Sequence, residues 1–110
     1  MTANKSPVEM AALIKKIYEM EFGGKERGRF KISRSNFRQL SQRTRLEEST
    51  IQKIMNEALE QGFIVTDLGD YFSVVEHKVM MNYRPVPKSI LKEFIKDADL
   101  IESDEDELES

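Results

Sequence analysis

Basic side chains are concentrated in one stretch of the chain. From Lys25 to Arg45 there are eight lysines and arginines and a single acid, Glu26, which gives a local charge of +7. Such side chains contact nucleic-acid phosphates, because each contact releases a condensed counterion, although a charge run can also be a solvated surface. We expect phosphate contacts first from Arg34, Arg38, Arg43 and Arg45, and second from Lys25, Arg27, Arg29 and Lys31, where basic residues can also protect a strand edge.

Four polar residues further along the chain have the types that reach bases. Ser49, Gln52, Lys53 and Asn56 fall between the apolar positions of a predicted helix and therefore face outward. Amide side chains pair with adenine, and lysine pairs with guanine or with a phosphate oxygen. We expect this face to contact base edges, against the alternative that each residue is only solvated.

Residues that could catalyse a reaction are scarce. The chain has no Cys and one His, His77, which has no partner near it in the sequence and is expected to be structural. Gly23-Gly24-Lys25 lacks the spacing of a phosphate-binding loop. The closely spaced carboxylates lie in the C-terminal tail, which cannot hold the fixed geometry that catalysis needs. We therefore predict no enzyme, no metal site and no cofactor.

The net charge of −3 conceals a division of charge along the chain. Residues 97–110 carry eight acids and no basic residue, so residues 1–96 hold all 17 lysines and arginines against 12 acids. We expect residues 99–110 to be a disordered acidic tail, because they have too little apolar content to offset the entropy of ordering. With no secretory signal and no apolar run of the roughly 20 residues that cross a bilayer, we expect a cytoplasmic protein without a membrane partner.

Short helices and strands must position these residues. The helix that follows residue 47 has an apolar stripe of Ile51, Ile54, Met55, Ala58 and Leu59, which we expect to form its core face. Helices are predicted over residues 7–22, 35–43, 47 or 48–61 and 87 or 88–98. A short strand is predicted over 29–32, and a hairpin of strands over 63–66 and 71–75. Residues 79–87 are predicted to be extended, with Met80, Met81 and Tyr83 packed on the body.

The segment from Leu40 to Ile64 resembles the helix-turn-helix pattern residue by residue. Leu40 and Ser41 match the apolar and small residues early in its second helix, and Leu46 matches the apolar residue of the turn. The matches continue at Thr50-Ile51, Met55, Ala58 and Gly62-Phe63-Ile64. Together with the order of helix, strand, two helices and hairpin, this makes the chain similar to the winged helix-turn-helix superfamily, with no single subfamily indicated.

The resemblance implies an α+β fold, a winged helix over residues 1–98 with an additional C-terminal helix. It implies duplex DNA binding through the basic helix-turn-helix face, as in a transcriptional regulator or an accessory protein of a plasmid, phage or mobile element. The chain departs from the family at Arg45, where a turn glycine is common. It also departs at Glu47-Glu48 and at the acidic wing tip Asp67–Asp70, which would suit a protein-interaction module instead.

The C-terminal part of the chain predicts protein partners. Ile90, Leu91, Phe94 and Ile95 provide more apolar surface than a terminal helix needs, which indicates either packing on the first helix or a homodimer. The acidic tail is expected either to dock on a basic protein or to fold back on the arginine patch and weaken nonspecific DNA binding.

Overall fold

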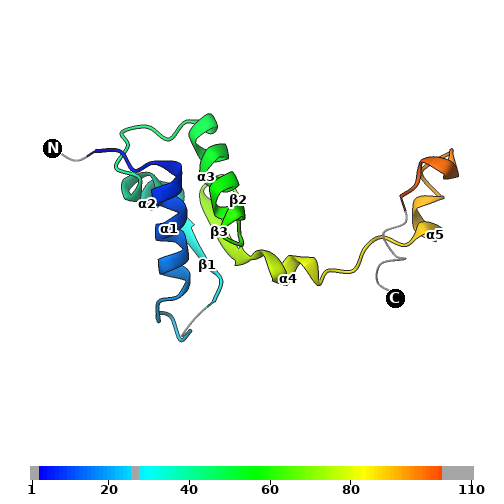
Figure 1. Ribbon diagram of the computed structural model, residues 1–110, viewed down its shortest axis with the longest axis horizontal. Coiled ribbons are helices and arrows are strands. Elements are labelled where there is room, and N and C mark those ends of the chain that lie inside the picture. Colours follow the sequence, from blue (N-terminus) through cyan, green and yellow to red (C-terminus); the bar gives the residue numbers. More distant parts are fainter. Residues whose placement is uncertain (1–2, 26–27, 103–110) are drawn as a thin grey trace.

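The structure, a computed structural model, describes residues 3–25 and 28–102. It has a body of helices and a small sheet, from which a C-terminal arm leads away (Figure 1). In the described residues the elements are α1 (Pro7–Tyr18), β1 (Phe30–Ser33), α2 (Arg34–Leu40), α3 (Glu48–Glu60), β2 (Phe63–Asp67), β3 (Tyr71–Glu76), α4 (His77–Met81), α5 (Lys88–Leu91) and a 3₁₀ turn at Ala98–Leu100. The chain is therefore α+β.

Helix α1 begins at a complete capping box. The Ser6 hydroxyl accepts from the Glu9 amide at 3.1 Å, and the Glu9 carboxylate accepts from the Ser6 amide at 2.9 Å. The hydrogen bonds from Ser6 lower the pKa of Glu9, because they favour its charged form. Pro7 follows at the first helical position, where its missing amide costs no hydrogen bond.

The prediction that this helix reaches residue 22 is wrong. Helix α1 ends at Tyr18, and the Lys25 ammonium donates to the carbonyls of Tyr18 and Met20 at 3.3 and 2.5 Å. The segment turns back through an antiparallel bridge between Phe22 and Lys25. The carbonyls at the end of α1 are therefore satisfied by a basic side chain, as suits a helix C-terminus.

The three strands form one antiparallel sheet in the order β1-β3-β2. Phe30 lies opposite Val74, and Ile32 lies opposite Phe72, so these residues share the inner face. Lys31 lies opposite Ser73, and both face the other way because side chains alternate along a strand. The predicted hairpin is confirmed, with β2 and β3 each extending one residue beyond the predicted end.

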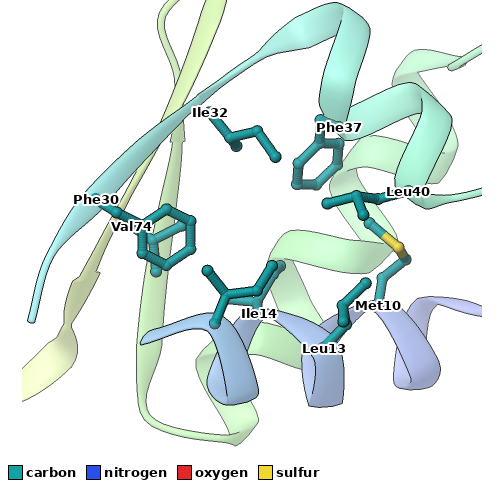
Figure 2. A pocket seen from close by; sticks show the side chains of 9 residues that line it. Met10, Leu13, Ile14, Phe30, Ile32, Phe37, Leu40 and Val74 are labelled. Atoms are coloured by element: carbon teal, nitrogen blue, oxygen red, sulfur yellow. The ribbon is translucent and has the colours of Figure 1, made fainter. Parts of the chain in front are cut away.

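The hydrophobic core lies between the inner face of the sheet and helices α1, α2 and α3. Phe37 of α2 stacks on Phe72 of β3 with ring centroids 4.3 Å apart, and both side chains are almost completely buried. Figure 2 shows Phe30, Ile32 and Val74 of the sheet facing Ile14 of α1 across an apolar crevice. The crevice has no space for a water molecule, so it is part of the core and not a ligand pocket.

Two of the predicted helices differ in extent or packing. Helix α2 spans Arg34–Leu40 and ends earlier than predicted, because the chain leaves the helix at Gln42 with a positive φ. Helix α3 agrees with its predicted bounds, and Ile51, Ile54 and Ala58 are buried. Leu59 is half exposed, so its assignment to the core face is wrong; it lines an open groove with Ile64 and Val65 of β2.

The part of the structure from helix α4 onwards differs most from the prediction. Residues 77–81 form helix α4, whereas an extended segment was predicted over 79–87, and the Met81 side chain is exposed instead of packed on the body. Tyr83 is 65% exposed, although it lines a groove together with residues of β1 and β3. The α-helix predicted to reach Ala98 stops at Leu91, since a short helix without a packing surface is marginal. Asp99 and Leu100 lie in a 3₁₀ turn and Ile101 is buried, while the rest of the predicted disordered tail, residues 103–110, lies outside the described residues.

Candidate nucleic-acid interface

An open groove on the body is lined by three arginines. Arg34 and Arg38 come from α2, and Arg45 comes from the loop before α3. The groove has a volume of about 310 Å³ and is completed by Ser35, Thr44 and Leu46. No acidic side chain is among these lining residues. The groove therefore concentrates positive charge beside the start of α3.

Arg34 joins α2 to the hairpin. Its Nη1 donates to Asp67 Oδ1 and to the Gly69 carbonyl, each at 2.9 Å, and its backbone amide donates to the Asp70 carbonyl. The guanidinium also lies over the Phe72 ring at 5.2 Å from its centroid. These contacts fix one side of the groove and neutralise one acid of the hairpin turn.

The turn between α2 and α3 is held by a set of side chain to backbone hydrogen bonds. Arg38 Nη1 donates to the Arg43 carbonyl at 3.0 Å, and Arg43 Nη2 donates to the Lys5 carbonyl at 3.0 Å. Lys5 returns to the turn, because its backbone amide donates to the Ser41 carbonyl and its ammonium donates to the Leu40 carbonyl. Arg43 is thus occupied with the N-terminal segment. This role for Lys5 was not predicted, and nothing in the spacing of the sequence indicates it.

The residue of the turn that takes a left-handed conformation is Gln42, with a φ of +60°. Arg45, which stands where the helix-turn-helix pattern that the sequence resembles often has glycine, has no positive φ. Ser41, just before Gln42, is completely buried and donates from its hydroxyl to the Arg38 carbonyl at 2.5 Å. Only a small side chain fits there, so the turn must form around Ser41.

Replacing Gln42 with glycine is expected to raise the free energy of unfolding by about 0.5–1 kcal/mol. A left-handed conformation costs a side chain about 1–2 kcal/mol, and the greater freedom of glycine in the unfolded chain offsets part of the gain. Urea denaturation measures the change. Gln61→Gly is the matched control, because Gln61 ends α3 with a φ of −86° and should lose stability on the same substitution.

The outer face of α3 carries the four residues expected to reach bases. Ser49, Gln52, Lys53 and Asn56 are all exposed. Gln52 Nε2 donates to Asn56 Oδ1 at 3.1 Å, which aligns the two amides one helical turn apart. Glu47 and Glu48 are exposed at the start of the same helix, and Glu47 makes no capping hydrogen bond. The face is thus polar along its length and acidic at its first turn.

The basic residues that were expected to contact phosphate second, Lys25, Arg27, Arg29 and Lys31, do not form one patch in the described residues. Lys25 caps α1, whereas Arg29 and Lys31 line a second groove on the outer face of the sheet. The Lys31 ammonium lies 4.9 Å from the centroid of the Tyr71 ring. Arg27 lies outside the described residues. The structure therefore separates Arg29 and Lys31 from the groove of Arg34, Arg38 and Arg45.

Features of other site classes are few. His77 begins α4, and its backbone amide donates to the Gly62 carbonyl. In residues 3–25 and 28–102 no three His, Cys, Asp or Glu side chains gather in a way that could hold a metal ion. None of the helices described is both long and apolar enough to span a bilayer. Comparison of the chain with protein-family models, with curated proteins and with solved structures finds no match.

Proposed function

We propose that the body of this protein is a winged helix that binds duplex DNA. The order α1-β1-α2-α3-β2-β3 and a three-stranded antiparallel sheet under three helices are compatible with that arrangement. In this proposal α3 enters the major groove, and the β2–β3 turn is the wing. The resemblance noted in the sequence extends the proposal to a regulatory or accessory role on DNA, such as that of a plasmid or phage protein.

The observation that carries the proposal is the convergence of Arg34, Arg38 and Arg45 on one groove. Each guanidinium has five N–H donors. Within the described residues, the side chains of Arg34 and Arg38 each donate from Nη1 only. Arg45 is exposed and makes no hydrogen bond or ion pair in the part of the chain that the structure describes. Donors therefore remain for the oxygens of a phosphate that crosses the groove.

The remaining predicted residues take separate roles in the proposal. Arg43 holds the turn in place, so it positions the groove without contacting phosphate. Gln52 and Asn56 reach base edges, and Lys53 contacts either a base or a phosphate. Glu48 repels a phosphate from the first turn of α3, which leaves the arginine groove as the place where the DNA backbone lies.

A salt titration tests the proposal directly. Binding of the full chain to a labelled random duplex, followed by fluorescence anisotropy, should weaken steeply as salt increases. Three phosphate contacts alone give a slope of log K against log salt of about −2.7, because each contributes about −0.9. A slope close to zero, or no binding at low salt, would contradict the proposal.

A second candidate is a protein partner that binds between α3 and β2. Here Met55, Leu59, Ile64 and Val65 line an open groove of about 230 Å³, with Gln52 and Asn56 at its side. Leu59 is half exposed, as at a small apolar contact site. Leu59→Lys separates the two candidates, because it would abolish an apolar protein contact while maintaining or strengthening nonspecific binding to DNA.

A further inference from the structure

The arm, defined as residues 82–102, exposes large apolar side chains that a solvated segment does not need. Phe94 and Leu100 are 78% and 73% exposed, although their neighbour Ile101 is buried. Tyr83, Val86 and Ile90 are also exposed. Several large apolar side chains exposed together on one ordered segment are typical of an interaction site.

The arm is preformed and directed away from its own body. Pro85 and Pro87 restrict the connection between α4 and α5 to extended conformations, and α5 lies far from the sheet (Figure 1). At its far end the Asp97 carboxylate accepts from the Asp99 amide, which shapes the 3₁₀ turn. The apolar residues of the arm are thus presented to something other than α1 or the core.

The outer face of the sheet has an uncovered groove of complementary chemistry, which we call the outer-sheet groove. It has a volume of about 370 Å³ and is lined by Arg29, Phe30, Lys31, Ser73, Val74, Val75 and Tyr83. Tyr71 is 44% exposed beside it, under the Lys31 ammonium. Phe30 and Val74 belong to the inner face, so the outward side chains of the groove are those of Arg29 and Lys31 with Ser73, Val75 and Tyr83, and the groove has no acidic lining residue.

The far half of the arm has the opposite charge. Asp97, Asp99 and Glu102 lie around Leu100, without a basic residue between Asp97 and Glu102. The near half is basic, with Arg84, Lys88, Lys92 and Lys96 against Glu93, so it does not match the groove. Charge and apolarity together point to the segment 97–102 as the part of the arm that fits the outer-sheet groove.

We propose that the far half of the arm of one copy docks in the outer-sheet groove of a second copy, and that the exchange is reciprocal. A two-fold exchange forms both contacts in one association, which is why a short segment is sufficient. Tyr83, near the start of the arm, lines the groove of its own chain. In the proposed dimer the segment 97–102 of the second copy therefore meets the start of the first copy's arm at this residue. The groove of Arg34, Arg38 and Arg45 is left open, and the proposal stands whether or not that groove binds DNA.

Sedimentation velocity of the full chain tests the exchange. Over a range of about 1–100 μM the mass should rise from 12.8 kDa towards twice that value, because association depends on concentration. Leu100→Ser should weaken the dimer at least about tenfold, since one apolar side chain is lost from each of the two docked segments. A monomer mass throughout the range for the unaltered chain would overturn the proposal.

A charge exchange distinguishes docking between copies from folding back within one chain. Arg29→Glu/Lys31→Glu and Asp99→Lys/Glu102→Lys should each be monomeric, because in either homodimer the reversed side chains face side chains of like charge. An equimolar mixture of the two variants should dimerise again, since both contacts of the mixed dimer join opposite charges. Lys15→Glu/Lys16→Glu on α1 is the control, and it should dimerise like the unaltered chain. A mixture that stays monomeric would contradict exchange between copies.

Discussion

Replacing Phe72 with alanine is expected to lower the free energy of unfolding by about 3–5 kcal/mol. The ring is completely buried, stacks on Phe37, and lies under the Arg34 guanidinium. Its removal leaves a cavity where the sheet meets α2. Because small domains have only about 5–15 kcal/mol of stability, the variant should be close to unfolding at physiological temperature.

Equilibrium urea denaturation followed by circular dichroism measures this loss. Leu68→Ala is the control, because Leu68 is 62% exposed in the hairpin turn and its truncation should change stability by less than about 0.5 kcal/mol. Equal effects of the two substitutions would mean that Phe72 is not at the centre of the core. The core described between the sheet and α2 would then be wrong.

Reversing the charges of Arg45 and Lys53 is expected to weaken binding to duplex DNA by on the order of 100-fold, on the proposal that Arg45 contacts phosphate and with Lys53 taken in the phosphate-binding one of its two proposed roles. A hydrogen bond to a charged group contributes about 1.5 kcal/mol, and two such bonds correspond to that ratio. Both side chains are exposed, and neither makes a hydrogen bond or ion pair among the described residues. Arg45→Glu/Lys53→Glu should therefore fold normally, and the salt slope should fall by about 1.8.

Lys15→Glu/Lys16→Glu is the matched control for this measurement. It makes the same change in net charge on the exposed side of α1, away from the arginine groove. If binding depends on the groove and not on overall charge, the salt slope of the control should differ from that of the unaltered chain by less than about 0.9, the contribution of one phosphate contact. An equal loss of DNA affinity in both variants would show that the attraction depends on overall charge and would contradict the assignment of phosphate binding to the arginine groove.

Local patterns in the sequence predict the elements of the body well. Ser6, Pro7 and Glu9 predict the start of α1, because a cap and its reciprocal acid act within one turn. Alternation in residues 63–66 and 71–75 around Gly69 predicts the hairpin for the same reason. The end of α1 is not predicted, since it depends on Lys25 returning to the carbonyls of Tyr18 and Met20.

The candidate site is predicted only in part. The types and clustering of the arginines indicate phosphate binding, but they do not show which side chains remain available. Arg43 is directed to the Lys5 carbonyl, a residue 38 positions away, whereas Arg45 stays exposed. No local signal distinguishes the two, because the distinction depends on where the N-terminal segment crosses the turn.

The sequence by itself determined the basic stretch, the acidic C-terminal end, the starts of α1 and α3 and the hairpin, because these depend on residue type and on spacing within a few positions. Only the tertiary structure decided that Arg34, Arg38 and Arg45 meet in one groove while Arg29 and Lys31 lie on the outer face of the sheet. It also decided that Leu59 and Phe94 are exposed, although their spacing matches that of buried residues. The physical reason is that burial depends on which surface covers a side chain, and that surface comes from distant parts of the chain or, in our proposal, from a second copy.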